Sequence, residues 1–570
     1  MTGKPGFSDI PNEIVLERWK RNVEAHPDRE AIIHWHAKAP PFRWTWGNLF
    51  RRAYVYADRL RESGVGAGDV CAILFRHHEE FYPLYLSVIA LGALPAVLHY
   101  PNTKLHPDKF RDGLRGMARH SGLDWIVTER ELEEILRPLL DDQETTLRGF
   151  LFPLAEGSDL PADGVSREFH PHASPDSPCF LQHSSGTTGL QKAVIISNRA
   201  ILRNVRYLSE STLLTKEDRI VSWLPLYHDM GLICALYLSL TCAVPFVQID
   251  PFEWVAVPSL FLEAISREKG TLAFLPNFAY NFMADRIRDK ELASVRLDSV
   301  RMLVSGGEPV RAESLDKFHR RFSPYGLKRE ALAAVYGLAE ATAAVTMTPP
   351  GKEARRVAVK RGELSTGSVV PAGPGDDVRV CVSSGVPIPE CTVRIVDEKG
   401  EDLPEGRVGE LAIRSVSLFG GYRNAPEKTA EVLRDGWLFS GDYGFTLGGE
   451  YYIIGRKKDI IIVAGRNLYP EDIEDAVGQV DGVIPGRVIA FGLWDDASGT
   501  EAVCLVAETA AERPEERRDL RMKMREACLG IEVAIGRIYL VPPRWLIKSS
   551  SGKPARKANR DRAVESVEWS

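Results

Sequence analysis

The sequence predicts an α/β protein with a large, multi-lobed N-terminal domain and a small α+β C-terminal domain. The chain has 570 residues, and single hydrophobic cores stop growing at about 250–300 residues, so more than one core is expected. Helix-like and strand-like patterns alternate as far as about residue 347, which is typical of α/β lobes. Short strand-like runs dominate from Thr392 onward, which predicts a part of a different kind at the C-terminus.

The N-terminal elements follow from the spacing of apolar residues. Residues 15–26 and 46–64 place apolar side chains at helical intervals, whereas residues 70–75 (VCAILF) are a short apolar run typical of a buried strand. Residues 82–92 predict a helix that leads into a strand within 93–101. This alternation predicts an α/β lobe at the start of the chain.

Two segments interrupt the pattern. Residues 158–178 are rich in Pro, Ser and Asp and predict a connector, after which strand-like residues stand on both sides of a small-residue loop at 184–192. Residues 348–384 are rich in Gly, Pro and charge, and they predict an insertion with little core of its own.

The border with the C-terminal domain is expected near residues 456–459. Residues 392–397 and 408–415 predict strands before this border, and residues 451–465 (YYIIGRKKDIIIVAG) look like a hairpin that crosses it. We therefore divide the chain into residues 1–456, with the insertion at 348–384, and residues 457–570.

The C-terminal domain itself is expected to be a compact α+β unit. A helix begins at Pro470, where proline and the following acids suit a helix N-terminus. Residues 488–496 and 501–508 predict two strands, and residues 518–528 predict a basic amphipathic helix.

The composition is that of an ordinary globular protein, with 44% hydrophobic and 26% charged residues. A formal net charge of -6 gives no reason to expect nucleic acid, which usually requires a basic domain or stripe. The first thirty residues contain no apolar core of the signal-peptide type, and no apolar stretch is long enough to span a bilayer. A cytoplasmic protein without a membrane span is expected.

The cysteines and histidines do not predict a metal site or disulfides. None of the eight cysteines forms a C-x-x-C pair, so we expect reduced, mostly buried side chains. The pairs His34/His36 and His77/His78 lack a carboxylate or cysteine at the spacing typical of metal ligands.

The segment HSSGTTGLQKAV, residues 183–194, predicts a phosphate-binding loop. Consecutive backbone N–H groups of small residues form a concave anion site, hydroxyls add donors, and Lys192 adds a positive charge. The expected phosphate contacts are Ser184, Ser185, Gly186, Thr187, Thr188, Gly189 and Lys192.

This loop is not a Walker loop, because the spacing differs and Ala193 stands where that loop has its Mg²⁺-binding hydroxyl. Considered alone, it leaves open the less favoured alternative of a solvated turn between two strands.

Seven segments taken in order resemble the successive motifs of the adenylate-forming (ANL) superfamily, which includes acyl-CoA synthetases, peptide-synthetase adenylation domains and firefly luciferase. These segments are SSGTTGLQKAV, LPLYHDMG, SGGEPV, YGLAEAT, SGDYG, GRKKDIIIVAGRN and KSSSGK. Within the superfamily the chain is most similar to the fatty acyl-AMP ligase and acyl-CoA synthetase group. SWLPLYHDMGLI, SGGEPVRAESLDKF, YGLAEATAAVT and the KRGELSTGSVVPA of the insertion carry that likeness.

The resemblance implies two α/β lobes, a β-rich subdomain and a mobile C-terminal domain. It also implies a ligase of fatty acid or polyketide metabolism with two half-reactions. A fatty-acid-like carboxylate attacks the α-phosphate of Mg-ATP to give acyl-AMP and pyrophosphate, and a thiol of CoA or of a carrier-protein phosphopantetheine then takes the acyl group. Concentrated negative charge develops in both transition states, so fixed cations and N–H donors should matter most.

The resemblance also implies roles for single residues. Glu340 would ligate Mg²⁺, His228 would lie near the carboxylate and α-phosphate, and Lys553 would bridge the two as the bond forms. Lys458 matches the hinge about which the small domain rotates. The adenine and ribose would contact Gly307, Glu308, Pro309, Tyr336, Gly337, Asp442 and Arg456.

The loop departs from the superfamily pattern, because many members have Pro-Lys-Gly where this chain has Gln191-Lys192-Ala193. Losing proline loosens the backbone, and a Cβ at position 193 is expected to narrow the approach to ATP, so adenylation could be weakened.

Three functions stay open. A ligase that loads a carrier protein is favoured, because in the subgroup the 348–384 insertion disfavours the domain placement that CoA needs. The alternatives are an acyl-CoA ligase and a half-reaction enzyme that makes thioester from supplied acyl-AMP. The acid itself is poorly specified, since the aromatic residues that could line its pocket could equally be core. These aromatic residues are Trp223, Tyr227, Phe274, Phe278, Tyr280 and Phe282.

Overall fold

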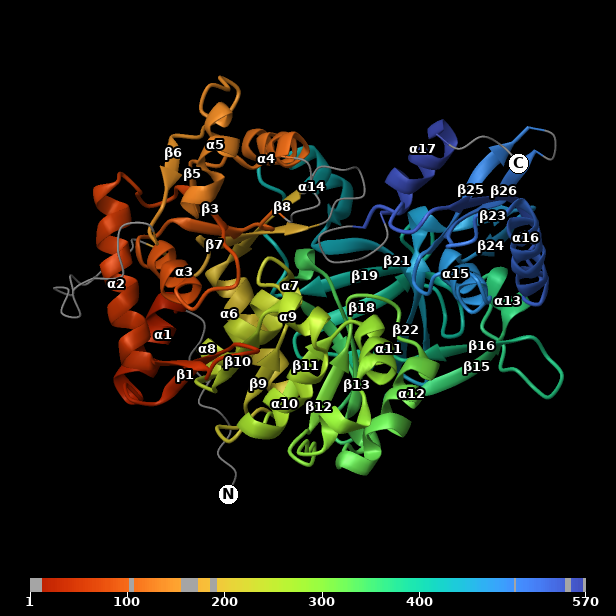
Figure 1. Ribbon diagram of the computed structural model, residues 1–570, viewed down its shortest axis with the longest axis horizontal. Coiled ribbons are helices and arrows are strands. Elements are labelled where there is room, and N and C mark those ends of the chain that lie inside the picture. The colour runs from red at the N-terminus through yellow and green to blue at the C-terminus, as the bar shows by residue number, and fades with distance from the viewer. Residues whose placement is uncertain are drawn as a thin grey trace.

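A nine-stranded sheet forms the centre of the protein (Figure 1). The computed structural model describes residues 13–101, 107–154, 173–184, 192–496, 499–548 and 555–566. In order across the sheet the strands are β17 (Val386–Pro387), β14 (Ala344–Met347), β13 (Leu332–Gly337), β12 (Met302–Ser305), β11 (Leu272–Leu275), β9 (Ile220–Ser222), β10 (Phe246–Ile249), β1 (Glu30–Trp35) and β2 (Phe42–Thr45). The strands from β13 to β1 are parallel. At one edge β2 pairs antiparallel with β1, and at the other β14 pairs antiparallel with both β13 and β17.

The parallel strands are short and almost wholly apolar, as expected for a sheet covered on both faces. The helices of this region are α1 (Val15–Ala25), α2 (Trp46–Glu62), α3 (Phe81–Ala90), α6 (Asn198–Ser211), α7 (Asp229–Gly231), α8 (Leu238–Cys242), α9 (Pro251–Ala256), α10 (Ser259–Glu268), α11 (Asn277–Arg286) and α12 (Ala312–Phe322). α2 illustrates why they form, because the Thr45 side chain caps it by accepting from the Asn48 N–H, and Leu49, Phe50 and Ala53 bury one face.

A second, four-stranded parallel sheet lies beside the first, in orange at the upper left of Figure 1. Its strands are β4 (Leu94–Val97), β3 (Val70–Leu74), β5 (Trp125–Thr128) and β6 (Gly149–Leu151), with helices α4 (Pro107–Ser121) and α5 (Glu133–Leu136). A hydrophobic core of its own packs one face of this sheet. The hairpin of β7 (Pro178–Ser184) and β8 (Lys192–Ser197) joins that core through Leu181 and Ala193.

The β-rich part follows as a five-stranded sheet of β18 (Cys391–Val396), β19 (Gly409–Ser415), β21 (Trp437–Leu447), β20 (Leu433–Arg434) and β22 (Glu450–Arg456), with α14 (Pro426–Val432). The insertion forms a hairpin of β15 (Arg356–Lys360) and β16 (Val378–Val382), with α13 (Arg361–Ser365) between them. Its Val359, Leu364 and Cys381 share one core with Tyr452 and Tyr469. The insertion is therefore packed onto its neighbours.

The C-terminal part, blue in Figure 1, has an α+β arrangement. It contains β23 (Ile461–Val463), β24 (Arg466–Leu468), α15 (Pro470–Gly478), β25 (Val488–Asp495), β26 (Thr500–Glu508), α16 (Pro514–Leu529), β27 (Ile535–Val541) and α17 (Arg556–Ser566). Two cores built from residues 461–563 serve this part, apart from the main core.

The fold class predicted from the sequence is confirmed, and most predicted elements lie within a few residues of their expected bounds. The prediction of a hairpin at residues 451–465 is wrong. β22 pairs with β21 and β23 pairs with β24, and a 3₁₀ turn at Lys457–Asp459 separates β22 from β23.

All eight cysteines are free and six are buried, as expected. Of the helices that the structure describes, none is long and apolar enough to cross a membrane.

Candidate active site

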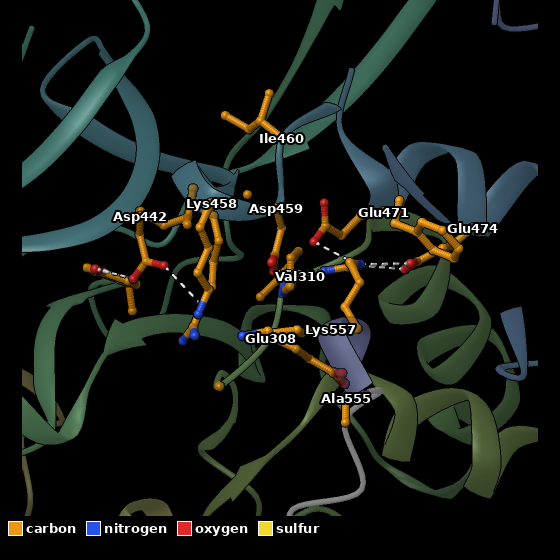
Figure 2. A pocket seen from close by; sticks show the side chains of 18 of the residues that line it. Glu308, Val310, Asp442, Lys458, Asp459, Ile460, Glu471, Glu474, Ala555 and Lys557 are labelled. Carbon is orange, nitrogen blue, oxygen red and sulfur yellow. Dashed lines mark hydrogen bonds and ion pairs between the residues drawn. The ribbon is translucent and has the colours of Figure 1, made fainter. Parts of the chain in front are cut away.

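A cavity of about 540 Å³ opens where the large part of the chain meets the C-terminal part (Figure 2). The predicted adenine and ribose residues lie together in its wall, as does the predicted hinge residue. Those residues are Gly307, Glu308, Pro309, Tyr336, Gly337, Asp442, Arg456 and Lys458. The opposite wall includes Glu471, Glu474, Ala555 and Arg556 of the C-terminal part.

Two neighbouring parallel strands, β12 and β13, bring part of this set together. The chain leaves β12 just before Gly306, and β13 ends at Gly337, so both ends meet at one edge of the sheet. Glycine is required at both points: an added Cβ would lie 2.5 Å from Val335 Cγ1 at position 306 and 1.9 Å from the Ala343 carbonyl oxygen at position 337. The two glycines therefore allow the backbone to pack closely where the strands end, at the wall that contains Tyr336.

Asp442 is the best-supported acceptor in the cavity. Its Oδ2 accepts from the Tyr336 hydroxyl at 2.8 Å, and its Oδ1 lies 3.4 Å from Arg456 Nε. Asp442 and Arg456 are direct partners across β21 and β22, which explains the pairing. Burial and the Asp442 carboxylate raise the pKa of Tyr336 well above its ordinary value, so its hydroxyl stays protonated and donates. A carboxylate held in this way retains lone pairs for ligand hydroxyls.

Glu340 and Lys192 contact a shared tyrosine that the sequence analysis missed. The Tyr422 hydroxyl donates to Glu340 Oε1 at 2.6 Å, and Lys192 Nζ lies 4.3 Å from the centre of the Tyr422 ring. Burial raises the pKa of Tyr422, so its hydroxyl also remains a donor. Tyr422 thereby links Lys192, a predicted phosphate contact, to Glu340, the predicted Mg²⁺ ligand.

Backbone pairing explains the position of Tyr422. The Arg423 N–H donates to the Ala193 carbonyl, and the Ile195 N–H donates to the Gly421 carbonyl, so residues 421–423 run alongside β8. No local pattern marks Tyr422 in the sequence, because this pairing joins segments more than two hundred residues apart.

The predicted phosphate-binding loop connects β7 to β8, between two antiparallel strands as expected, with Ser184 opposite Lys192. The expected contacts Ser185, Gly186, Thr187, Thr188 and Gly189 lie outside the described residues, as does the side chain of Ser184.

Ala193 faces away from the side of β8 that carries the Lys192 side chain. Its side chain is 4% exposed and belongs to the core of the four-stranded sheet. Successive strand residues point to opposite faces, so the Ala193 methyl cannot narrow the approach to a ligand beside Lys192. The expectation that it does so is wrong.

His228 lies at the start of α7 and is partly exposed. Its Nδ1 accepts from the Met230 N–H at 3.3 Å and lies 2.6 Å from Asp229 Oδ1. His228, Lys192 and Glu340 are not among the described residues that line this cavity. Glu340 and Lys192 nevertheless lie within electrostatic range of Arg456 and Lys458 in its wall.

Lys458 stands in the 3₁₀ turn between β22 and β23, where the chain passes into the C-terminal part. Partial burial in the cavity, and then the charge of Arg456, lowers the pKa of Lys458 to about 8.

Lys553 lies outside the described residues, whereas Ala555 and Arg556 close by in the chain line the cavity. Arg556 forms ion pairs with Asp459 at 2.9 Å and with Glu474 at 2.8 Å. These pairs hold the start of α17 against the turn that contains Lys458.

The insertion contacts the C-terminal part through Asp472 near the start of α15. Arg379 Nη1 lies 3.0 Å from Asp472 Oδ2, and Arg361 Nη1 lies 3.5 Å from the same oxygen. Arg311 of the large part lies 3.7 Å from Oδ1. Arg379 is 7% exposed and also covers the Tyr469 ring, so the contact is well shielded from water.

The aromatic residues considered for an acyl pocket separate into two groups. Phe274 and Tyr280 are core residues, with 1% and 0% exposure. Trp223 stacks on Trp254 with 3.6 Å between ring centroids, and Phe278 packs edge-on against both.

Comparison with known proteins agrees with this geometry. Residues 19–423 match the family model described as AMP-binding enzyme. The chain belongs to the AMP-binding enzyme family. This finding confirms the predicted membership of the adenylate-forming superfamily and the prediction of an AMP-forming acid ligase.

Individual relatives cover nearly the whole chain. A long-chain-fatty-acid–AMP ligase of Mycobacterium marinum is 30% identical, over 90% of this chain and 90% of the relative. A 4-hydroxyphenylalkanoate adenylyltransferase of Mycobacterium tuberculosis is 29% identical, over 91% of this chain and 86% of the relative. A structure from work on fatty acyl-adenylate ligases from E. coli and L. pneumophila superposes with a TM-score of 0.87 at 27% identity, over 97% of this chain and 98% of that one.

Proposed function

We propose that this enzyme uses ATP to convert a fatty-acid-like carboxylic acid into acyl-AMP and then loads the acyl group onto the phosphopantetheine thiol of a carrier protein. The observation that carries the proposal is the Asp442, Tyr336 and Arg456 cluster, which stands in a cavity between the two parts of the chain. The cavity is the right kind of site for a nucleotide that both parts must reach.

In the first half-reaction, a carboxylate oxygen of the acid attacks the α-phosphorus of ATP. The bond from that phosphorus to the oxygen leading to the β-phosphate breaks, and pyrophosphate leaves with the electron pair. In the second, the thiol sulfur attacks the acyl carbonyl carbon, AMP leaves with the electron pair, and the thiol proton passes to solvent.

The described residues divide the binding of ATP between them. Asp442 accepts the ribose hydroxyls, and the adenine lies on Tyr336 beside the backbone of residues 307–309. Lys192 neutralises phosphate charge. His228 would face the acid, and Lys553, which lies outside the described residues, would bridge the carboxylate and the α-phosphate as the family resemblance implies.

Mg²⁺ suits the donor set near Glu340, because this ion is usually held by one or two carboxylates together with substrate phosphates. It would neutralise the charge of the β- and γ-phosphates. The Tyr422 hydroxyl occupies one lone pair of Glu340 Oε1 and leaves Oε2 available to the ion.

The contact of Asp472 with the insertion favours a carrier protein over CoA as acceptor. We propose that residues 457–570 move as a domain about Lys458 between the two half-reactions. Arg361 and Arg379 of the insertion hold Asp472 and oppose large rotations of this domain. An acyl-CoA ligase would need that restraint to be weak.

To test the acceptor, the enzyme is incubated with the acid, ATP and either CoA or a carrier protein that bears a free phosphopantetheine thiol. The products are identified by mass spectrometry. Thioester on the carrier should dominate. Arg379→Met should raise CoA thioester formation about fivefold or more, whereas Arg394→Met, which removes an ion pair elsewhere, should not. CoA thioester formed by the wild-type enzyme as fast as carrier loading would favour the acyl-CoA ligase.

Adenylation is tested separately by pyrophosphate exchange with fatty acids and 4-hydroxyphenylalkanoates. No exchange, together with thioester formed from supplied acyl-AMP, would favour the half-reaction enzyme.

A further inference from the structure

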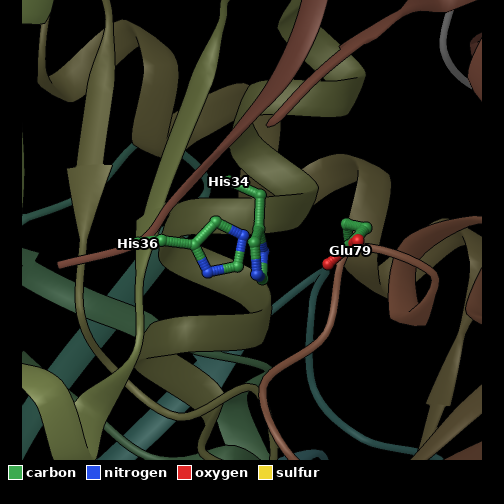
Figure 3. A group of neighbouring side chains, drawn as sticks. All are labelled: His34, His36 and Glu79. Atoms are coloured by element: carbon green, nitrogen blue, oxygen red, sulfur yellow. The ribbon is translucent and has the colours of Figure 1, made fainter. Parts of the chain in front are cut away.

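Two histidine pairs that are far apart in the sequence meet in the fold. His34 and His36 lie at the end of β1, and His77 lies with Glu79 in the connection from β3 to α3. One nitrogen each of His34 and His36 and a carboxylate oxygen of Glu79 all lie within 4.8 Å of one another (Figure 3). The His34 and His77 rings stack with 3.9 Å between centroids.

The donor atoms of this cluster are poorly satisfied by the protein. His34 is 0% exposed, its Nδ1 lies 2.9 Å from the Tyr82 hydroxyl, and its buried Nε2 has no hydrogen-bond partner within the described chain. The Nε2 of His77 is also buried and has no hydrogen-bond partner among the described residues. A buried polar group without a partner destabilises the folded state, so the unpaired Nε2 of His34 indicates that a ligand binds here.

We propose that His34, His36 and Glu79 bind a divalent transition-metal ion, with Zn²⁺ as the best-fitting ion. Two imidazoles and one carboxylate are a ligand set that zinc accepts, with water in the fourth position. Tetrahedral bonds of about 2.1 Å place ligand atoms roughly 3.4 Å apart, so small side-chain rotations close the set around the ion.

Tyr82 completes the site as a positioning residue. Metal binding selects the His34 tautomer whose Nδ1–H donates to the Tyr82 oxygen and whose Nε2 faces the ion. Hydrogen bonds of this type orient ligating histidines and typically change metal affinity by about 10–100-fold.

The position of the cluster indicates a structural role. β1 belongs to the nine-stranded sheet, whereas the connection with Glu79 leaves the four-stranded sheet. A bound ion would join the two sheets directly, and none of its ligands lines the nucleotide cavity. The histidine pairs lack a carboxylate at metal-ligand spacing in the sequence, and the fold supplies Glu79.

The test uses the full chain without an affinity tag, stripped with a chelator, exposed to excess ZnCl₂ and desalted. Elemental analysis should find about one zinc per chain, and zinc should raise the melting temperature, because a ligand of the folded state stabilises it. Co²⁺ should give the visible absorption of a tetrahedral site.

His36→Ala and Glu79→Gln should lose the retained zinc and the rise in melting temperature, and Tyr82→Phe should bind zinc about 10–100-fold more weakly. His120→Ala removes an exposed histidine of α4 and should behave as the wild type. Circular dichroism without zinc verifies that each variant is folded. A wild-type chain that retains no zinc, or folded His36→Ala and Glu79→Gln variants that retain as much as the wild type, would overturn the proposal.

Discussion

Replacing Tyr422 with phenylalanine removes a single hydroxyl from the link between Glu340 and Lys192. The ring stays, and with it the contact of Lys192 Nζ at 4.3 Å, whereas the 2.6 Å hydrogen bond to Glu340 disappears. Only the orientation of Glu340 is changed.

The magnitude follows from the kind of bond that is lost. A hydrogen bond to a charged group contributes about 1.5–3 kcal/mol. If the orientation of Glu340 is needed in the adenylation transition state, kcat/KM for Mg-ATP should fall about 10- to 150-fold, at 1.36 kcal/mol for each factor of ten.

The assay is acid-dependent pyrophosphate exchange measured over a range of Mg²⁺ concentrations. Tyr422→Phe should need more Mg²⁺ for half-maximal exchange. The matched control is Tyr451→Phe, which removes a 2.7 Å hydrogen bond to the Val393 carbonyl away from the cavity and should leave the Mg²⁺ requirement unchanged. Wild-type exchange and Mg²⁺ dependence in Tyr422→Phe would refute the role of Glu340 as metal ligand.

Three further predictions concern Lys458, at the proposed hinge, and Ala193 of β8. Lys458→Pro should spare acyl-AMP formation but slow thioester formation about tenfold or more, because it stiffens the turn on which the domain rotates; equal loss of both rates would refute the hinge. Because the pKa of Lys458 is about 8 without ligand and bound polyphosphate favours its charged form, the Kd for ATP should rise above pH 8. Lys458→Gln should flatten this rise in calorimetric titrations, and an unchanged pH profile would place the phosphates elsewhere. Ala193→Gly should lower the free energy of unfolding by about 1–2 kcal/mol without raising pyrophosphate exchange; faster exchange would mean that Ala193 limits ATP binding after all.

Local patterns were sufficient for most of the fold. α2 could be predicted because its apolar face repeats at helical intervals and Thr45 caps it, and the parallel strands because they are unbroken apolar runs. The hairpin at 451–465 was mispredicted because the partners of β22 and β23 are decided by β21 and β24. A strand-like pattern of residues predicts that a strand forms, but it does not indicate which other strand will pair with it.

Some residues of the candidate site can be predicted from local sequence, and others cannot. The glycines at 306 and 337 and the acid at 442 stand in recognisable segments, and the structure places them together. Tyr422, the arginines around Asp472 and the His34 cluster depend on contacts between distant segments, and none of them has a local signature. Ala193 was misread because its side-chain direction depends on the strand phase of β8.

The most direct test of the central proposal is pyrophosphate exchange by the wild-type enzyme and Asp442→Asn, with a panel of fatty and 4-hydroxyphenylalkanoic acids. We predict exchange that depends on the acid in the wild type, and a loss of about tenfold or more in the variant, because the ribose loses a charged hydrogen-bond acceptor. No exchange with any acid, or undiminished exchange in Asp442→Asn, would contradict ATP-dependent acid activation at this cavity.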